Sequence, residues 1–314
     1  MIAESEYCPK ESIITVEHAS ARLLRKPWGS HDLRPWSNLE PGAAAVGEIW
    51  FERAVMNAPD PALLLKLLFA NEALSIQVHP DDAFARSIDL AHGKTEAWYI
   101  LSATSNAKVA VGLTWRPTTQ QLRTSIEDGS IADMVCWHYV RSGDIVFVPA
   151  GAIHAIGPGL VIAEVQQRSD ATFRLFDFGR QRELHVDYAV TVAYVGPAVT
   201  QTASRRLTDA RTLLVACPYF VLERIDLVPD SIWQLNASSE TWLLVLDGQA
   251  RVGPISLSVG GTAFLDADTA TVRVGTNSFS GLVAYLGTEP RQGLLNGLSE
   301  RTADSPVHSV ETLS

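Results

Sequence analysis

The sequence predicts a mainly β protein of two β-barrel or sandwich units, with a short helical insertion in the first. Three observations support this prediction. Most apolar runs are short, and several alternate with polar residues at the period of two that is typical of strands. One helical stretch interrupts these runs, unlike the regular alternation of an α/β chain. Segments of the first half recur faintly in the second, and 314 residues fit about two domains.

Composition and charge narrow the functional classes. The hydrophobic fraction of 46% and the charged fraction of 19% are typical of a folded globular protein. Lys and Arg total 25 against 35 Asp and Glu, and this net charge of −10 argues against nucleic-acid or anionic-membrane partners. The three cysteines are far apart, and no apolar run approaches the ~18 residues of a membrane span. Without an apolar leader segment, we expect a cytoplasmic protein.

The strands of the first unit are expected within residues 1–200. Leu63 to Phe69 is a short apolar run, and Leu74 to Pro80 alternates strictly after an intervening Asn-Glu turn. Both patterns predict strands, the first buried and the second with one polar face. Further strands are expected over residues 97–101, 107–113, 144–149, 160–165 and 172–176.

Residues 118–139 are the clear interruption in this series of strands. Thr118 or Thr119 can N-cap a helix that ends at Gly129, and a second short helical segment follows. We therefore expect a helical insertion in the first unit.

A faint internal repeat predicts the second unit. Residues 96–101 resemble 240–245, and residues 143–149 resemble 260–266. Chance similarity between apolar strands is the alternative explanation. If the repeat is real, a second and degenerate β unit lies within residues 201–290, and the polar residues 291–314 form a C-terminal tail.

Polar side chains gather on one face of the strand Leu74 to Pro80. Alternation places Ser75, Gln77 and His79 together on that face. On an open sheet such a face meets solvent, which is its commoner explanation. On a barrel strand the same face points inward, where polar groups need partners and usually have a task.

Two further motifs add chemistry. Lys94 and Glu96 are two residues apart and share a strand face, although such a pair is often only a surface ion pair. A Gly-Asp turn, a short strand and a Pro-x-Gly turn at 149–151 lead to His154 and aim it at the mouth of a barrel. A single histidine after a loop is otherwise commonly a core or surface residue.

Taken together, these motifs predict a metal site. Gln77, His79, Glu96 and His154 supply two imidazoles, a carboxylate and an amide oxygen, which suit one divalent ion per chain. No cysteine takes part, so the site would be of the open, catalytic kind rather than a closed structural one.

The same segments resemble the type I mannose-6-phosphate isomerases, in their short bacterial form with two cupin units. The resemblance is carried by Leu74–Asp82, Gly93–Trp98, Pro149–Ile156 and Glu164–Arg174, and more weakly by Lys26–Gly29 and Gly47–Trp50. It implies two cupin-type (jelly-roll) barrels and an enzyme of carbohydrate metabolism. That enzyme interconverts mannose 6-phosphate and fructose 6-phosphate, an aldose and a ketose, through an enediol(ate).

The resemblance also implies roles for individual residues. The ion is zinc in that family, and its matching ligands are the four residues named above. Arg174 matches the catalytic arginine, and Lys94 and Ser75 match residues at the substrate, near its phosphate or its reacting carbons. Whether Lys94 is the base or a phosphate contact stays open. The cluster of Arg168, Arg174, Arg180 and Arg182 supplies a local positive field for a sugar phosphate.

The second unit and two loops depart from the pattern. Thr271 stands where the repeat would place the counterpart of His154, so the second unit is expected to be structural. The loop after residues 176–180 is shorter than in the family, and Gly-Ser-His at 29–31 replaces a Gly-Gly pair. Both loops could shape the substrate pocket, which leaves the preferred sugar phosphate open. A monomer or homodimer is expected.

Other functions use the same scaffold. A metal cupin oxygenase normally carries an open facial set of histidines and a carboxylate for iron, without the Lys-x-Glu motif or the late arginine. A non-catalytic sugar-phosphate-binding cupin, or a metal cupin acting on another sugar phosphate, is the closer alternative.

Overall fold

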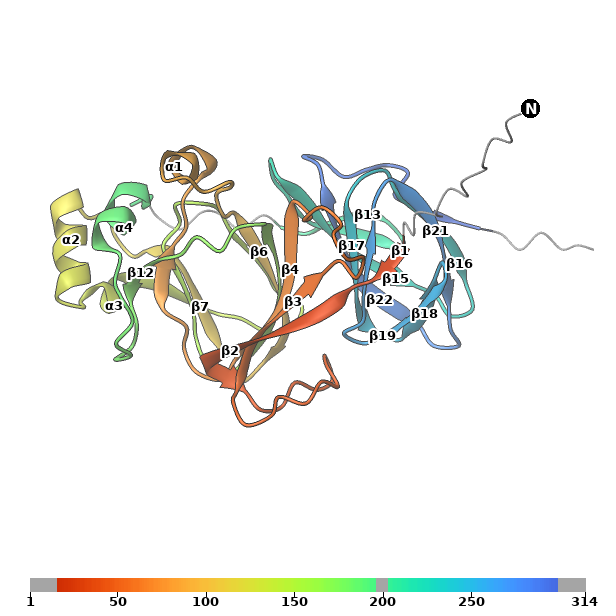
Figure 1. Ribbon diagram of the computed structural model, residues 1–314, viewed down its shortest axis with the longest axis horizontal. Helices are drawn as coiled ribbons and strands as arrows, with labels where there is room; N and C mark the ends of the chain where they lie inside the picture. The colour runs from red at the N-terminus through yellow and green to blue at the C-terminus, as the bar shows by residue number, and fades with distance from the viewer. Residues whose placement is uncertain (1–15, 196–202, 299–314) are drawn as a thin grey trace, which may run out of the picture.

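The structure is a computed structural model that describes residues 16–195 and 203–298, and it contains two β units side by side (Figure 1). Each unit consists of two facing sheets, and the only helices in the described ranges belong to the first unit. The predicted mainly β, cupin-like fold with a helical insertion in the first unit is thereby confirmed.

A six-stranded sheet forms one wall of the first unit, in the order β2-β3-β4-β11-β6-β9. Its central strand β4 is buried along its whole length, as the apolar run predicted. The strands are β2 (Ser20–Ser30), β3 (Val46–Glu52), β4 (Leu63–Ala70), β6 (Glu96–Ala103), β9 (Ile145–Val148) and β11 (Leu160–Gln167).

A five-stranded sheet forms the opposite wall, in the order β12-β5-β10-β7-β8. Ile100 and Ile162 of the first sheet pack with Val109 and Ile156 of this one, so an apolar core fills part of the space between the walls. The strands are β5 (Ile76–Val78), β7 (Lys108–Leu113), β8 (Val135–Tyr139), β10 (His154–Ile156) and β12 (Phe173–Phe176).

The helical insertion packs on the outer side of the five-stranded sheet, at the end of the molecule away from the second unit (Figure 1). Thr118 N-caps α2 through a reciprocal capping box with Gln121. Gly129 follows with φ +83°, a left-handed conformation that favours glycine and ends the helix. The helices are α1 (Asp82–Ser87), α2 (Thr119–Glu127), α3 (Ile131–Met134) and α4 (Val186–Val192).

The second unit repeats the arrangement of two sheets. Its larger sheet has the order β1-β20-β17-β22-β15-β14-β13, and the smaller has the order β19-β18-β21-β16-β23. The strands are β1 (Val16–His18), β13 (Arg205–Thr208), β14 (Arg211–Ala216), β15 (Phe220–Leu227), β16 (Ile232–Ala237), β17 (Thr241–Asp247), β18 (Gln249–Val252), β19 (Ile255–Ser258), β20 (Thr262–Leu265), β21 (Asp268–Val274), β22 (Phe279–Leu286) and β23 (Leu295–Gly297).

Both ends of the described chain belong to the second unit. β1 pairs with β20 there before the chain enters the first unit through β2. Residues 291–298, expected as part of the polar tail, instead include β23, which pairs with β16. The reason is apolar burial, because Leu294 and Leu295 pack into the core of the second unit. Residues 299–314 lie outside the described ranges.

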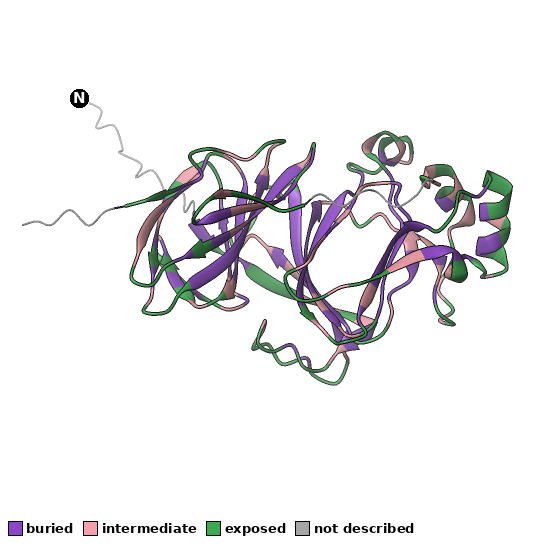
Figure 2. Ribbon diagram, turned by 180° about the vertical axis from the view of Figure 1, so that it is seen from behind, coloured by how far each residue is buried: buried purple, intermediate pink, exposed green. Residues whose placement is uncertain are grey.

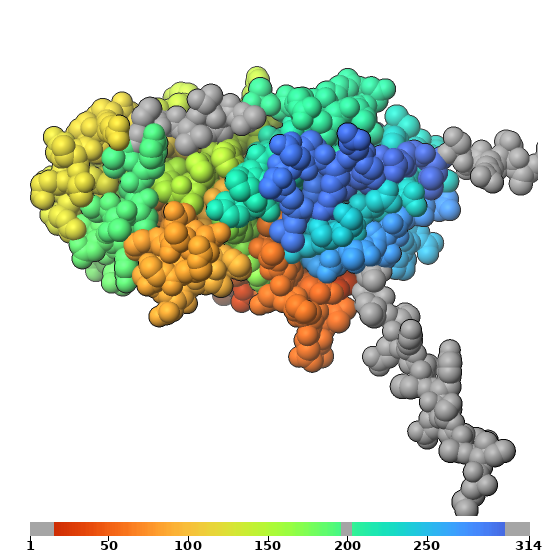
Figure 3. All heavy atoms as spheres, turned by 90° about the horizontal axis from the view of Figure 1, so that it is seen from above, coloured from red at the N-terminus to blue at the C-terminus, as the bar shows by residue number. Residues whose placement is uncertain are grey.

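The two units share a continuous apolar interface. Leu65 and Leu67 of β4 belong to one buried cluster with Leu222, Trp242 and Phe264 of the second unit. The burial colouring shows purple strands on both sides of this contact (Figure 2). In the space-filling view, the cyan-to-blue second unit lies directly against the first (Figure 3). No helix in the described ranges has the length and apolarity needed to span a bilayer.

Candidate metal centre

A polar cavity of about 370 Å³ opens between the two sheets of the first unit. Residues from both sheets and from the connections between them line it. The charged and polar residues in its lining are Lys26, Glu48, Lys66, Ser75, Gln77, Lys94, Glu96, Glu164, Asp170, Thr172, Arg174, Arg182, Glu183 and His185. Five of the seven predicted site residues therefore line this cavity, and the other two are His79 and His154.

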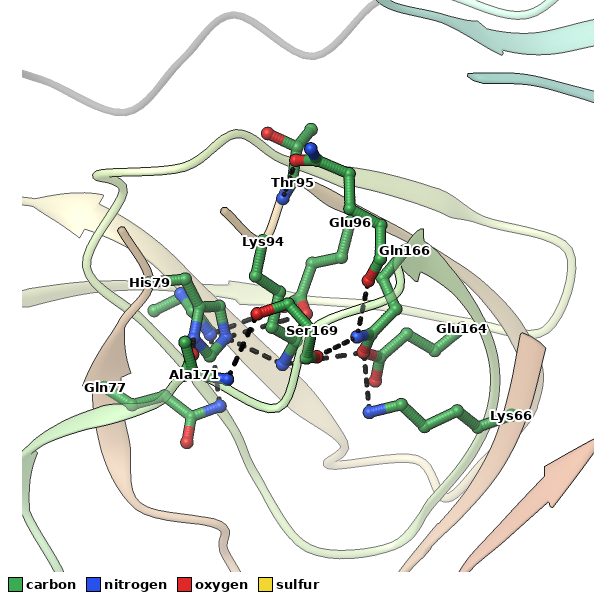
Figure 4. Close-up of polar contacts among 12 residues, drawn as sticks. Lys66, Gln77, His79, Lys94, Thr95, Glu96, Glu164, Gln166, Ser169 and Ala171 are labelled. Carbon is green, nitrogen blue, oxygen red and sulfur yellow. Dashed lines mark hydrogen bonds and ion pairs between the residues drawn. The ribbon is translucent and has the colours of Figure 1, made fainter. Parts of the chain in front are cut away.

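The four predicted ligands lie close together, and Gln77 and Glu96 line the cavity; Gln77, His79 and Glu96 are labelled in Figure 4. Gln77 lies on β5 opposite His154 of β10, and Glu96 is the first residue of β6. The Nε2 atoms of His79 and His154 lie 3.6 and 3.4 Å from the two carboxylate oxygens of Glu96. Nε2 of Gln77 lies 3.2 Å from Nε2 of His154. Strand alternation and turn chemistry thus bring together the residues that the sequence singled out.

Backbone carbonyls orient both imidazoles. Nδ1 of His79 donates to the carbonyl of Ala171 at 2.8 Å, and Nδ1 of His154 donates to the carbonyl of Ala152 at 2.8 Å. Burial, with a contribution from Lys94, holds the pKa of His79 well below its usual value, and burial lowers the pKa of His154 to about 4. Both rings are therefore neutral at pH 7, and each presents the lone pair of Nε2 to Glu96.

This arrangement of acceptors fits a cation. Two imidazole lone pairs and a carboxylate converge without a proton to share, which is unfavourable unless a positive charge lies among them. His79, Glu96 and His154 place their ligand atoms within 4.8 Å of one another, and within the described ranges they are the only cluster of this kind. Lys94 supplies positive charge here, with Nζ 2.9 Å from Nε2 of His79 and 3.0 Å from Oε2 of Glu96.

A buried ion cluster that the sequence analysis missed continues from Lys94 across the cavity. Nζ of Lys66 lies 3.2 Å from Oε1 of Glu164 and 3.9 Å from Oε2 of Glu48, and Nζ of Lys94 lies 3.8 Å from Oε1 of Glu164. Lys66 and Glu164 are direct cross-strand neighbours on β4 and β11. The sequence signal for each is a single charged residue within its strand. A charged side chain is rarely buried without a partner.

Opposing effects set the charges of this cluster. Burial raises the pKa of Glu164 to about 7, and the nearby carboxylate of Glu96 acts in the same direction. Burial alone would lower the pKa of Lys66, but the carboxylates of Glu164 and Glu48 outweigh it and raise that pKa. Lys66 is therefore a permanent cation, whereas Glu164 is poised to exchange a proton near neutral pH.

Backbone contacts hold the segment that carries Lys94 and Glu96. The N–H of Lys94 donates to the carbonyl of Pro80 at 2.9 Å, and the N–H of Thr95 donates to Oε1 of Gln167 at 3.0 Å. The hydroxyl of Thr95 accepts the N–H of Ala150 at 3.1 Å, in the turn that precedes His154. Two strands that carry predicted ligands are thus tied together through one threonine.

The mouth of the cavity carries two arginines. Arg174 of β12 donates from Nη1 to the carbonyl of Glu183 at 2.7 Å, and its backbone N–H donates to Nδ1 of His185 at 3.1 Å. Arg182 donates from Nε to Asp177 at 2.8 Å. Both arginines line the cavity, half-buried, close to the polar wall formed by β5 and β12.

The expected cluster of four arginines is only partly present at the cavity. Arg168 pairs with Asp60 at 3.2 Å, and Arg180 contacts Asp177 and Glu72. Neither of these two arginines lines the cavity. The local positive field at the mouth therefore comes from Arg174 and Arg182, not from all four. Ser75 does line the cavity, and its hydroxyl donates to Oε1 of Gln77 at 3.2 Å.

Comparison with known proteins identifies curated relatives of this chain. No family model matches the sequence. The chain is 37% identical over 205 residues to the mannose-6-phosphate isomerase of Streptococcus mutans, covering 60% of this chain and 62% of that protein. It is 34% identical over 208 residues to the mannose-6-phosphate isomerase ManA of Bacillus subtilis, covering 60% and 63%. The matched region therefore spans about three fifths of these curated relatives.

Solved structures extend the similarity to the second unit. The mannose 6-phosphate isomerase from Bacillus subtilis superposes with a TM-score of 0.74 at 26% identity, over 86% of this chain and 99% of that one. The apo form of mannose 6-phosphate isomerase from Salmonella typhimurium gives a TM-score of 0.68 at 14% identity, over 85% and 98%, which supports the fold alone. The resemblance that the motifs predicted is confirmed by these matches.

Proposed function

We propose that this chain is a metal-dependent aldose–ketose isomerase that interconverts mannose 6-phosphate and fructose 6-phosphate. One observation carries the proposal: two neutral, oriented imidazoles and Glu96 converge at one end of a polar cavity whose mouth holds Arg174 and Arg182. The cavity thus combines a candidate electrophilic centre with two arginines that can bind an anion, as a phosphorylated sugar requires. The curated relatives that match the chain are named for this reaction.

Zinc is the ion that we propose, one per chain, held by Gln77, His79, Glu96 and His154. Imidazole nitrogens with a carboxylate suit zinc, and the ligand set leaves room for substrate. Gln77 presents its carboxamide to the same point, and exchanging its oxygen and nitrogen positions gives an oxygen ligand in place of the amide nitrogen. Such an ion acts as a Lewis acid on a carbonyl and stabilises the oxyanion that develops from it.

Lys94 is the base that we propose for the proton that moves between C2 and C1. Its ammonium is buried and contacts His79, Glu96 and Glu164, the first two of which are proposed metal ligands. This position favours the reacting carbons over the phosphate, the two roles that the sequence left open. A general base must lie beside the carbons whose proton it moves, which is the reason for placing Lys94 in this role.

Arg174, Arg182 and Ser75 of the cavity lining supply the proposed contacts to the phosphate and hydroxyl groups. Arg174 and Arg182 are permanent cations, and we propose that they receive the phosphate or the developing oxyanion of the substrate. Asp177 holds Arg182 in place, and the carbonyl of Glu183 fixes the guanidinium of Arg174. The hydroxyl of Ser75 is proposed to contact the sugar.

The organisation of the chain is part of the same proposal. The first unit, from β2 to α4, would carry catalysis, and the second unit, from β13 to β23 together with β1, would be structural and hold no metal. We further propose that the protein acts in the cytoplasm as a monomer or homodimer. The separated cysteines support the cytoplasmic assignment.

Metal content and isomerase activity measured on the same preparation test the proposal. We expect about one zinc per chain by elemental analysis and conversion of mannose 6-phosphate to fructose 6-phosphate that a chelator abolishes. His154→Ala should lose most bound zinc and activity, because it removes one of two imidazole ligands. His138→Ala changes an exposed histidine and serves as the matched control. Zinc binding without turnover would favour a non-catalytic sugar-phosphate-binding protein.

A further inference from the structure

The second unit reaches into the first through Glu240, a buried residue directly before β17 that is 6% exposed. Its Oε2 accepts the N–H of Ala62 at 2.6 Å, and its Oε1 accepts the N–H of Leu63 at 2.9 Å. Oε1 also accepts the indole N–H of Trp242 at 3.0 Å. A carboxylate of one unit therefore supplies acceptors for the first backbone donors of β4 in the other.

Strand pairing explains why Glu240 points this way. The sequence repeat aligns Glu240 with the proposed metal ligand Glu96. In the structure, however, Glu96 lies opposite Val148, whereas Leu265, the matching downstream position, lies opposite Thr241. By pairing, the counterpart of Glu96 is Thr241, and Glu240 is displaced by one residue.

A displacement of one residue moves every side chain of a strand to the other face of its sheet. Trp98 of β6 packs in the core between the two sheets of the first unit. Trp242 of β17, its counterpart in the sequence repeat, packs instead in the cluster between the units. Glu240 shares the face of Trp242 and is thereby directed at the first unit rather than into its own barrel.

Hydrogen bonds lead from Glu240 to the metal centre. The carbonyl of Ala62 accepts the N–H of Arg168 at 2.8 Å, at the start of the turn that follows β11. Within that turn, Ser169 accepts from Nε2 of Gln166 at 2.6 Å, and its hydroxyl accepts the N–H of Ala171 at 3.3 Å. The carbonyl of Ala171 then accepts Nδ1–H of His79 (Figure 4).

We propose that Glu240 is a positioning residue for the metal centre, acting from the second unit through Ala62 and the turn 168–171 on the ring of His79. The inference rests on the proposed function in one respect, namely that His79 is a metal ligand. Partners that orient a metal-binding imidazole through its other nitrogen affect metal affinity although they never touch the ion. The second unit would then be part of the working site and not only a passive support.

A carboxylate suits this position better than an amide. Three N–H donors converge on Glu240, and a carboxylate accepts all three because it has only acceptor positions. The buried charge has no Lys or Arg ion-pair partner in the described ranges, so these donors are what stabilise it. In Glu240→Gln the oxygen can still serve Leu63 and Trp242, but the amide NH₂ then faces the N–H of Ala62.

The test compares Glu240→Gln with the wild-type chain by two measurements. In the metal-free protein, hydrogen exchange should become faster in a peptide spanning residues 168–172. Zinc affinity, measured by competition with a chelator, should fall about tenfold, the lower end of the effect known for residues that orient metal ligands. Tyr99→Phe is the control, because it removes another hydrogen bond between the units, from Arg224 at 3.3 Å, away from this path.

Each outcome decides the inference. Faster exchange and weaker zinc binding in Glu240→Gln, with both unchanged in Tyr99→Phe, support it. Unchanged exchange in residues 168–172, or zinc affinity within twofold of wild type, overturns it. If Glu240→Gln does not fold, Glu240→Asp carries the same test, because the shorter side chain cannot reach both backbone donors. The exchange measurement needs neither zinc nor turnover, so failure of the proposed function would be seen separately.

Discussion

Nζ of Lys94 lies 2.9 Å from Nε2 of His79, and only 1% of the His79 side chain and 5% of the Lys94 side chain are exposed. Because the imidazole is neutral and its Nδ1 donates to Ala171, Nε2 must act as the acceptor and the ammonium as the donor. Lys94 thus places its positive charge where the proposed metal ligands converge. An ammonium and a divalent ion at such short range repel each other strongly in a buried site.

Replacing this ammonium should separate metal binding from catalysis. In Lys94→Met we expect zinc affinity equal to or higher than that of the wild type, since a competing cation is removed. We expect kcat to fall by ~10²–10⁴, the usual contribution of a general base. Elemental analysis, chelator competition and steady-state kinetics measure the two effects. Lys108→Met, outside the cavity, should change neither, and wild-type kcat in Lys94→Met would exclude Lys94 as the base.

The buried pair Lys66–Glu164 should contribute to stability in a way that depends on both partners. Lys66→Met leaves Glu164 and Glu48 without their shared cation, and breaking a buried pair typically costs about 3–5 kcal/mol. The double variant Lys66→Met/Glu164→Gln removes one orphaned charge and should recover part of that loss. Urea unfolding gives the free energies. Equal stability of the single and double variants would show that Glu164 costs nothing after its partner Lys66 is removed.

The ligand set was predictable from the sequence because its signals are local. Alternation in residues 74–80 fixes which side chains share a face, and the Pro-x-Gly turn before His154 sets its direction. Lys66 and Glu164 were not predicted, because their meaning depends on the register between β4 and β11, which are far apart in the chain. Local patterns predict the direction of a side chain but not its partner across a sheet.

The second unit shows the same limit. Its existence follows from the repeat and from strand patterns, and the structure contains it. Whether Glu240 faces its own barrel or the neighbouring unit depends on a displacement of one residue in pairing, which sequence alignment alone does not reveal. β23 was likewise missed, since a three-residue strand next to polar residues carries too few apolar positions to form a pattern.

The depressed pKa of His154 predicts a pH-dependent stability of the metal-free protein. Its folded pKa is about 4 against 6.5 when unfolded, so between these values the unfolded chain binds a proton that the folded chain does not. Stability due to His154 is therefore present above pH 6.5 and is lost as the pH falls toward 4. The full effect is about 3 kcal/mol at 1.36 kcal/mol per pH unit.

Glu164 acts in the opposite direction, since its raised pKa makes the folded chain bind more protons than the unfolded chain between pH 4.5 and about 7. The measurement is therefore the difference in unfolding free energy between wild type and His154→Gln, by urea titration with a chelator at several pH values. This difference should shift in favour of the wild type as the pH rises from 4 to 7. A difference independent of pH would show that His154 titrates normally in the folded protein.

Arg174 allows the sharpest test of the reaction, because its charge cannot be titrated away. Its guanidinium lines the cavity, and the bond from Nη1 to the carbonyl of Glu183 fixes its orientation. If it stabilises the enediolate, Arg174→Ala should lower kcat by ~10²–10³ with a smaller change in KM and unchanged zinc content. If it only anchors the phosphate, KM should rise while kcat stays within a few-fold.

Two further variants complete this comparison. Arg174→Lys keeps the charge but loses the planar fork, and should recover little of a role that needs two parallel hydrogen bonds. Arg168→Ala removes an arginine that pairs with Asp60 outside the cavity, and should leave both kinetic constants near wild type. A global electrostatic effect would make the two alanine variants alike, whereas a positioned guanidinium makes only Arg174→Ala defective. Wild-type kcat in zinc-loaded Arg174→Ala would rule out its catalytic role, because the reaction would then proceed at full rate without this guanidinium.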